Sequence, residues 1–174
     1  MLYVEEKPEL ARAIVEDLGG GTKRTGFYEC GNDIVTWCYC HMLQLYEPHD
    51  YDISFKTWSL ESLPMFFVPW KKRPVAKSKE QFAIIVGLLR TADTVVHAGD
   101  PDAEGQLLID EMLQYVDFPG AVKRVLINDN NPAVVKKAPA NLRDSAAFKG
   151  LSAAADASQV GDQLYGFNMT RLYT

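Results

Sequence analysis

An acidic stretch between a strand-like run and a helix-like run most constrains the fold of this chain. Asp100, Asp102 and Glu104 alternate with other residues in the segment 97–106. The apolar run 94–96 before them is typical of a buried strand, and the apolar residues after them recur at helical spacing. The acids therefore fall where a strand ends and a helix begins, which is where ligands bind in α/β sheets.

These three carboxylates favour a metal site. Carboxylates at one strand end repel one another unless a cation neutralises them. Mg²⁺ suits this position because it takes oxygen ligands, usually one or two carboxylates together with substrate phosphates. Alternation along an extended turn aims Asp100, Asp102 and Glu104 to one side, while Gly99 and Gly105 allow a tight backbone path.

A structural role for the same acids is the alternative. Asp102 is a good N-cap for the helix that follows, and Glu104 would lie favourably near the positive end of the helix dipole. Capping uses only one or two of the three acids, so the metal site is favoured. Because Asp-x-Asp spacing also occurs in calcium loops, spacing alone does not identify the metal.

The composition is that of one folded domain. The 174 residues are 47% hydrophobic and 24% charged, which is enough for a substantial core. No apolar run approaches the ~20 residues that a membrane helix needs. Acids at Glu5 and Glu6 interrupt any signal-peptide pattern. We therefore expect an unprocessed cytoplasmic protein that has no membrane partner.

The net charge of −5 argues against a surface that binds nucleic acid by positive charge alone. A local basic cluster is nevertheless present between positions 71 and 79. Its members are Lys71, Lys72, Arg73, Lys77 and Lys79. Phosphate contact and a solvated loop are equally compatible with this cluster.

The three cysteines, Cys30, Cys38 and Cys40, are expected to be free thiols in buried strands. Cys38 and Cys40 precede His41 in a pattern similar to a metal cluster, but a zinc site usually needs a second ligand pair. His41 and His49 are candidate ligands by residue type, but lone histidines in loops are more often exposed, so we expect both to be exposed loop residues.

The start of the chain repeats the strand–turn–helix arrangement. An apolar run at 2–4 ends in acids, Pro8 suits the first turn of a helix, and the apolar residues of 10–18 recur at helical spacing. If both strands lie in one parallel sheet, Glu6 and the acidic stretch lie at the same edge.

The next segments predict additions to that sheet. Residues 22–26 are expected to form a polar loop, and the runs 27–30 and 34–39 a hairpin. The segment 41–79 is rich in proline and aromatic residues, so we expect an irregular insertion with one helical turn at 59–63. Its aromatic residues are expected to pack the insertion onto the body; they are Trp58, Phe66, Phe67 and Trp70.

The remaining periodic runs predict an α/β fold with a central, mostly parallel sheet flanked by helices. We expect helices at 79–89, 103–116, 132–142 and 150–165, and strands at 94–96 and 122–127.

Several motifs together resemble a known family. Glu6 after the first strand, with Asp100-x-Asp102-x-Glu104 after a later strand, is typical of the Toprim domain. Wider motifs resemble bacterial topoisomerase III, a type IA DNA topoisomerase. They lie at 6–8, 29–32, 35–38, 97–102, 104–108, 126–129 and 164–171.

The resemblance implies a Toprim catalytic domain at 1–150 and the start of a truncated helical domain at 151–174. It implies that a tyrosine cuts and reseals one DNA strand, with Mg²⁺ held by the residues Asp100, Asp102, Glu104 and Glu6. Glu6 would also move a proton at the 3′-hydroxyl, and Lys7 would stabilise the scissile phosphate.

The implied partners are single-stranded DNA and downstream domains of the same polypeptide. No tyrosine here matches the family's nucleophile motif, so the chain by itself is not expected to relax DNA. Two departures weaken phosphate binding: Ala103 stands where the family usually has arginine, and the segment 157–163 lacks the family's arginines.

Two other functions remain open. Another Toprim enzyme, a primase or a nuclease, would use the same acids, although those proteins lack the motif at 164–171. A degenerate module that binds single-stranded DNA or a protein without metal is compatible with Ala103 and the negative net charge.

Overall fold

A mixed sheet of seven strands forms the centre of the computed structural model, which describes residues 1–127 and 141–173. The strand order is β2-β3-β4-β1-β7-β8-β9. In chain order the strands are β1 (Leu2–Glu5), β2 (Thr22–Arg24), β3 (Phe27–Cys30), β4 (Asp33–Trp37), β7 (Thr94–His97), β8 (Ala121–Arg124) and β9 (Arg143–Asp144). The four central strands β4, β1, β7 and β8 are parallel, and the outer pairings are antiparallel. The predicted sheet with an added hairpin is confirmed.

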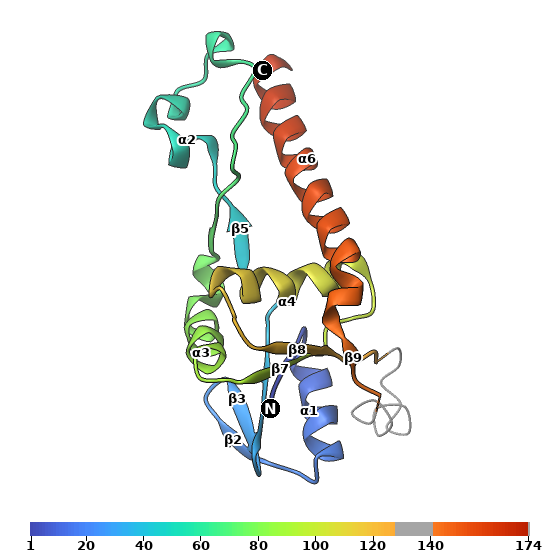
Figure 1. Ribbon diagram of the computed structural model, residues 1–174. Helices are drawn as coiled ribbons and strands as arrows, with labels where there is room; N and C mark the ends of the chain where they lie inside the picture. The colour runs from blue at the N-terminus through green and yellow to red at the C-terminus, as the bar shows by residue number, and fades with distance from the viewer. Residues whose placement is uncertain (128–140, 174) are drawn as a thin grey trace.

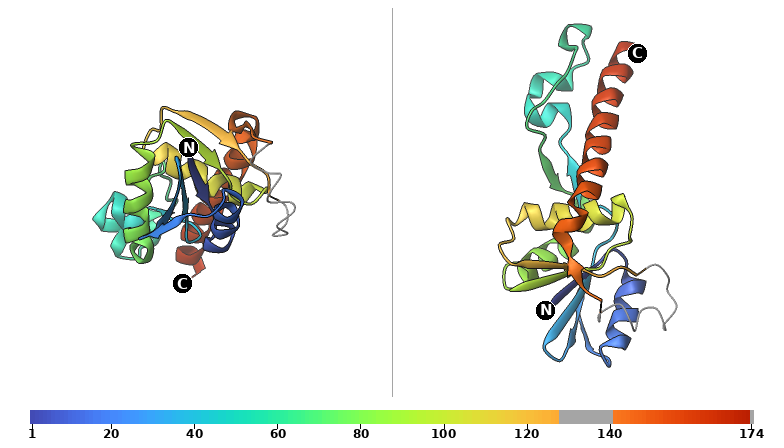
Figure 2. Two further views of the ribbon diagram at one scale, coloured as in Figure 1. Left: turned by 90° about the horizontal axis from the view of Figure 1, so that it is seen from below. Right: turned by 45° about the vertical axis from the view of Figure 1, so that its right-hand side comes forward.

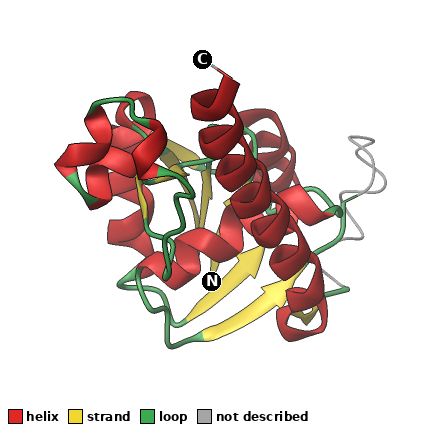
Figure 3. Cartoon of the chain, turned by 90° about the horizontal axis from the view of Figure 1, so that it is seen from above, coloured by secondary structure: helices red, strands yellow, loops and turns green. Residues whose placement is uncertain are grey.

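Helices cover both faces of this sheet (Figures 1 and 3). Helix α1 (Pro8–Asp17) packs on one face, and α3 (Lys79–Leu89) and α4 (Ala103–Tyr115) pack on the other. The long helix α6 (Lys149–Tyr173) crosses α4 and continues away from the sheet. This layering is the α/β arrangement that the alternating strand and helix patterns predicted.

The central strands are buried on both sides, which explains their nearly continuous apolar sequence. In β1, Leu2 and Val4 face the core under α3 and α4, whereas Tyr3 faces the core under α1. In β7, Val95 joins the first core and Val96 the second. Strand side chains alternate between the two faces, so each strand fills both cores.

The segment 46–71, here called the arm, leaves the body between β5 (Leu43–Leu45) and β6 (Lys72–Pro74). These two strands pair as an antiparallel ribbon, and the arm rises from them beside α6 (Figures 1 and 2). The arm is less irregular than predicted, since it contains α2 (Pro48–Tyr51) and the 3₁₀ turns Ile53–Lys56 and Leu60–Ser62. The second of these turns confirms the predicted helical turn.

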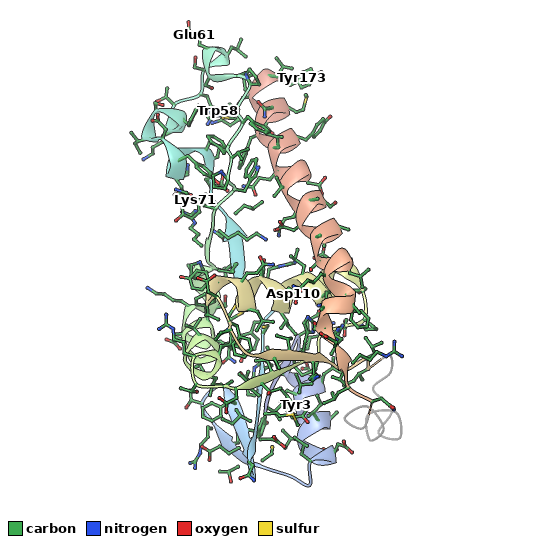
Figure 4. All side chains as sticks on the ribbon, viewed as in Figure 1. Tyr3, Trp58, Glu61, Lys71, Asp110 and Tyr173 are labelled. Atoms are coloured by element: carbon green, nitrogen blue, oxygen red, sulfur yellow. The ribbon has the colours of Figure 1, made fainter. Side chains whose placement is uncertain are left out.

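The prediction that the aromatic residues pack the arm onto the body is wrong. Tyr51 stacks on Phe67 with ring centroids 4.3 Å apart, and Trp70 meets Phe67 edge-on at 5.9 Å. Phe66 is 68% exposed, and Trp58 turns toward α6 beneath Arg171 (Figure 4). Because the arm stands clear of the sheet, its aromatic residues form a small core of their own.

Helix α6 holds the arm through polar side chains. Asn168 accepts from the Met65 amide and donates to the Met65 carbonyl, at 2.7 and 3.0 Å. Arg171 donates to the Phe55 carbonyl and to Ser62 Oγ. The predicted helix 150–165 is therefore too short, because its continuation is stabilised by the arm.

Other boundaries also differ from the predictions. Residues 22–24 form edge strand β2 because they pair with β3, and the strand predicted at 122–127 ends at Arg124. The helix predicted at 132–142 falls mostly outside the described residues. In the described parts of the chain, no helix is long and apolar enough to span a membrane.

The cysteines are free, as predicted, but only two of them are buried. Cys30 and Cys38 lie in the core, and burial raises the pKa of both thiols. Cys40 is exposed and has a positive φ of 56°, because the chain turns there to leave the sheet.

Candidate metal and phosphate site

The carboxyl ends of two neighbouring parallel strands build the candidate site. Glu6 follows β1 and Asp100 follows β7, and in the strand register Val4 lies beside His97. The Asp100 amide donates to Glu6 Oε2 at 3.3 Å, although the two residues are 94 positions apart. The predicted meeting of Glu6 and the acidic turn (residues 99–105) at one edge of the sheet is confirmed.

Lys7 lies between these two carboxylates. Its Nζ is 2.7 Å from Asp100 Oδ2 and 3.1 Å from Glu6 Oε1. The hydrogen bond to Asp100, and to a lesser extent that to Glu6, raises the pKa of Lys7, so its ammonium is charged at neutral pH. The Lys7 side chain is 46% exposed, which leaves this ion-pair group open to an approaching ligand.

The other two predicted ligands have different partners. Asp102 Oδ1 accepts from the Gly105 amide at 2.7 Å and caps α4, so the structural alternative is realised for this residue. Glu104 is 66% exposed, and its Oε2 lies 2.9 Å from His41 Nε2. Within residues 1–127 and 141–173, no group of three His, Cys, Asp or Glu side chains is arranged to hold a metal ion.

The donor set nevertheless fits a hard cation. The Lys7 ammonium shows that a positive charge is stable between an oxygen of Glu6 and an oxygen of Asp100. Mg²⁺ usually takes only one or two protein carboxylates and completes its shell with water and phosphate oxygens. Glu6 and Asp100 supply that number, and Asp102 and Glu104 lie on the same turn.

His41 is not the exposed loop residue that the sequence predicted, whereas His49 is exposed. His41 Nδ1 lies 3.3 Å from the buried carboxylate of Glu111, while its Nε2 faces Glu104. The Glu111 carboxylate, and to a lesser extent Glu104, raises the pKa of His41. Glu104 and Glu111 are two helical turns apart on α4, a spacing that could have indicated a shared partner.

Part of the basic cluster has a structural role. Lys72 Nζ binds Glu111 Oε2 at 3.1 Å and Asp156 Oδ1 at 2.6 Å, which ties the base of the arm to α4 and α6. Arg73, also in β6, pairs with Asp50 of the arm at 2.6 Å. These two members of the cluster therefore hold the arm and its base in place.

Comparison with known families decides the identity of this domain. The model of the Toprim domain matches residues 1–130. The chain belongs to the Toprim family. The sheet edge that carries Glu6 and the acidic turn lies within the matched residues.

Relatives of this Toprim chain include much longer proteins. This chain is 45% identical to DNA topoisomerase 3 of Haemophilus influenzae and 44% identical to DNA topoisomerase 3 of Vibrio cholerae. In each case the match covers 99% of this chain and 28% of the relative. Full-length topoisomerase I of Thermotoga maritima has the same fold, with a TM-score of 0.57 and 18% identity over 99% of this chain and 24% of that one. The Toprim chain thus spans about a quarter of the length of the relatives that it matches.

Two titratable groups lie buried beneath the Toprim site. His97 is fully buried. Burial, and to a lesser extent the nearby positive charge of Arg124, lowers the pKa of His97 to about 3. Glu5 is also fully buried, and burial raises the pKa of its carboxyl. Its Oε2 accepts from the Glu6 amide, and among the described residues its Oε1 has no hydrogen-bond partner.

The buried His97 predicts a loss of stability in mild acid. Its pKa is about 6.5 when unfolded and about 3 when folded, so between these values the unfolded chain binds more protons. The free energy of unfolding therefore falls as pH drops below 6.5, and this contribution reaches about 2 kcal/mol at pH 5. Urea unfolding of the wild type and of His97→Asn at pH 7 and pH 5 measures it.

The expected result is a smaller pH dependence in the variant than in the wild type. Glu5 acts in the opposite direction, because its raised pKa makes the folded state bind more protons, but it is present in both proteins. The comparison therefore isolates His97. An equal pH dependence in both proteins would contradict the assignment of a neutral buried His97.

Proposed function

We propose that this chain is the metal- and phosphate-binding half of a type IA DNA topoisomerase. In this proposal, a tyrosine from a downstream domain of the same polypeptide cuts one DNA strand, and the same site reseals it. The observation that carries the proposal is the cluster of Glu6, Lys7 and Asp100 at the carboxyl edge of the sheet. The topoisomerase relatives over the whole chain support it.

Each member of the cluster has a distinct role in this proposal. Lys7 binds the scissile phosphate and stabilises the charge that develops on it. Glu6 lies next to Lys7 and transfers a proton to and from the 3′-oxygen that leaves and later attacks. Asp100 is the principal candidate ligand of Mg²⁺, which when bound neutralises phosphate charge and orients the reacting group.

Asp102 and Glu104 are the further candidate ligands, together with Glu6. For this role Asp102 has to release the Gly105 amide, and Glu104 has to release His41. Both acid side chains are exposed, so water can hydrate the oxygens that they free, and release of the Gly105 amide costs about 1 kcal/mol, the usual value for the loss of an N-cap.

The proposal includes the wider organisation of the protein. Residues 1–150 form the Toprim catalytic domain, and 151–174 begin a following helical domain through α6. Single-stranded DNA and the downstream domains are the proposed partners, Mg²⁺ is the proposed cofactor, and the cytoplasm is the expected location. A protein of this kind would lack activity in the isolated 174-residue chain.

One specific observation favours a second candidate, a nucleic-acid-binding module without catalysis. Among the described residues the acids do not form a three-ligand group, and Ala103 begins α4 without a cation for phosphate. Such a module would bind single-stranded DNA equally well with and without Mg²⁺. A Toprim nuclease or primase remains a further enzymatic alternative.

A chimera tests the proposal directly. This chain replaces the matching 28% of the Haemophilus influenzae relative, and cleavage of a labelled single-stranded oligonucleotide is measured with and without Mg²⁺. We expect Mg²⁺-dependent strand cleavage and a covalent protein–DNA product, both lost in Asp100→Asn because that variant removes the principal charged ligand. The unaltered relative is the positive control.

Three other outcomes would contradict the proposal. Binding of DNA without cleavage would support the non-catalytic module. Cleavage without a covalent product would favour a nuclease. Cleavage that persists unchanged in Asp100→Asn would remove the basis for the metal assignment.

A further inference from the structure

The buried Arg124 lies behind the acidic turn, where no ligand can reach it. We infer that Arg124 is the positioning residue of this site, because its guanidinium binds the backbone of the acidic turn and fixes where the carboxylates point. The inference rests on the proposed metal site and adds to it a residue that contacts neither metal nor DNA.

The contacts of Arg124 concentrate on the backbone at the end of β7. Nη1 donates to the carbonyls of His97 and Gly99, at 3.2 and 2.9 Å, and Nη2 donates to the carbonyl of Asp100 at 2.8 Å. A further bond from Nη1 to the Val125 carbonyl, at 2.6 Å, ties the turn to the end of β8. One side chain thus binds three of the four carbonyls between positions 97 and 100.

The guanidinium is itself held rigidly. Arg124 is 1% exposed, and its Nε donates to Gln106 Oε1 at 2.9 Å. Gln106 is also fully buried and donates to Asp110 Oδ2 at 3.0 Å and to Ser145 Oγ at 3.4 Å. The planar fork of arginine reaches all these acceptors at once, with the two N–H groups of Nη1 shared among three carbonyls, whereas the ammonium of a lysine has three donors at a single point.

This arrangement has two opposite effects on a cation at Asp100. The positive charge of Arg124 repels the cation, so electrostatics alone predicts that removing the charge tightens binding. The hydrogen bonds hold the Asp100 backbone and thereby orient its side chain, so positioning predicts that removing them weakens binding. The sign of the change in metal affinity therefore distinguishes the two roles.

The experiment measures Mg²⁺ and Mn²⁺ affinity of the 174-residue chain by calorimetry for Arg124→Lys and Arg124→Met. We expect both variants to bind metal roughly tenfold more weakly or worse, which is the usual effect of losing a residue that orients a metal ligand. Arg171→Lys is the matched control, because it breaks a comparable set of bonds at the arm and leaves the acidic turn intact. Its metal affinity should be unchanged.

Amide hydrogen exchange supplies a second readout that does not depend on metal. The amides of Gly99, Asp100 and Gly105 bond within the site, and we expect them to exchange at least about tenfold faster in Arg124→Lys while the β1 amides do not change. A purely structural role would instead accelerate exchange throughout the sheet. If both arginine variants fail to fold, Gln106→Met, which removes only the Nε partner, is measured in the same way.

The outcomes separate this inference from the proposed function. Tighter or unchanged metal binding in folded Arg124→Met, or unchanged exchange at the three amides, would overturn the positioning role. If the unaltered chain binds neither metal, the proposed metal site is wrong, and hydrogen exchange alone decides whether Arg124 orders the turn.

Discussion

Replacement of Lys7 by methionine is expected to tighten Mg²⁺ binding about tenfold and to reduce strand cleavage by the chimera about a hundredfold or more. The Lys7 ammonium binds Asp100 at 2.7 Å and Glu6 at 3.1 Å, so it competes with any metal for the same oxygens. Methionine retains most of the side-chain volume but has no charge. The two carboxylates are then left facing each other, and a cation relieves their repulsion.

The loss of cleavage has a separate cause. In the proposed mechanism the ammonium of Lys7 moves from the carboxylates to the scissile phosphate, where it stabilises charge in the transition state. Removal of one such donor typically costs two to three orders of magnitude in rate, roughly 10²–10³-fold. A single substitution should therefore change the two measured quantities in opposite directions.

Calorimetry on the 174-residue chain and oligonucleotide cleavage by the chimera measure the two effects. Lys23→Met is the matched control, because Lys23 is an exposed lysine on edge strand β2 and its replacement changes the net charge equally. The control should alter neither quantity by more than about twofold. Strand β2 is separated from β1 by β3 and β4, and salt largely screens exposed charges that lie farther apart than a Debye length. Weaker metal binding in Lys7→Met would show that Lys7 supports the metal rather than competing with it.

The meeting of Glu6 and Asp100 could be predicted from sequence because it depends only on periodicity. Two apolar runs followed by helical patterns predict parallel strands, and parallel strands place their carboxyl ends at one edge. The pairing of β1 with β7 confirms this. No side-chain detail was needed for that conclusion.

The conformations of Asp102 and Glu104 could not be predicted in the same way. Both capping and metal binding suit Asp102, and only the bond to the Gly105 amide shows which one is adopted here. Glu104 pairs with His41, which comes from a turn 63 residues earlier. Sequence spacing gives no information on such a contact until the chain path between the two elements is known.

The arm and Arg124 show two other limits of sequence reasoning. Aromatic residues in an irregular segment predict burial, but the pattern does not say whether Phe67 and Trp70 pack on the body or on each other. Arg124 lies inside the strand-like run 122–127, where a charged residue is usually taken to be exposed. Its burial follows from the backbone carbonyls at the end of β7, which no residue pattern encodes.

The second large effect is expected for Gly105→Ala, which should destabilise the chain by about 3 kcal/mol and abolish metal binding at the acidic turn. A Cβ at Gly105 would lie 2.7 Å from the Asp100 amide nitrogen and 2.9 Å from its carbonyl carbon, closer than real side chains approach. These atoms belong to the backbone and cannot rotate away. The first turn of α4 would therefore have to move away from the backbone of Asp100, the principal candidate ligand.

This expected loss of stability is opposite to the effect of helix propensity, since alanine within a helix normally stabilises it by about 0.5–1 kcal/mol relative to glycine. Gly87→Ala in α3 is the matched control, because nothing lies within 4 Å of the Cβ it would introduce. Urea unfolding should show the control slightly stabilised and Gly105→Ala strongly destabilised, while calorimetry shows normal metal affinity only in the control. If Gly105→Ala retained both stability and metal affinity, the close approach of α4 to Asp100 would not be what orients the site.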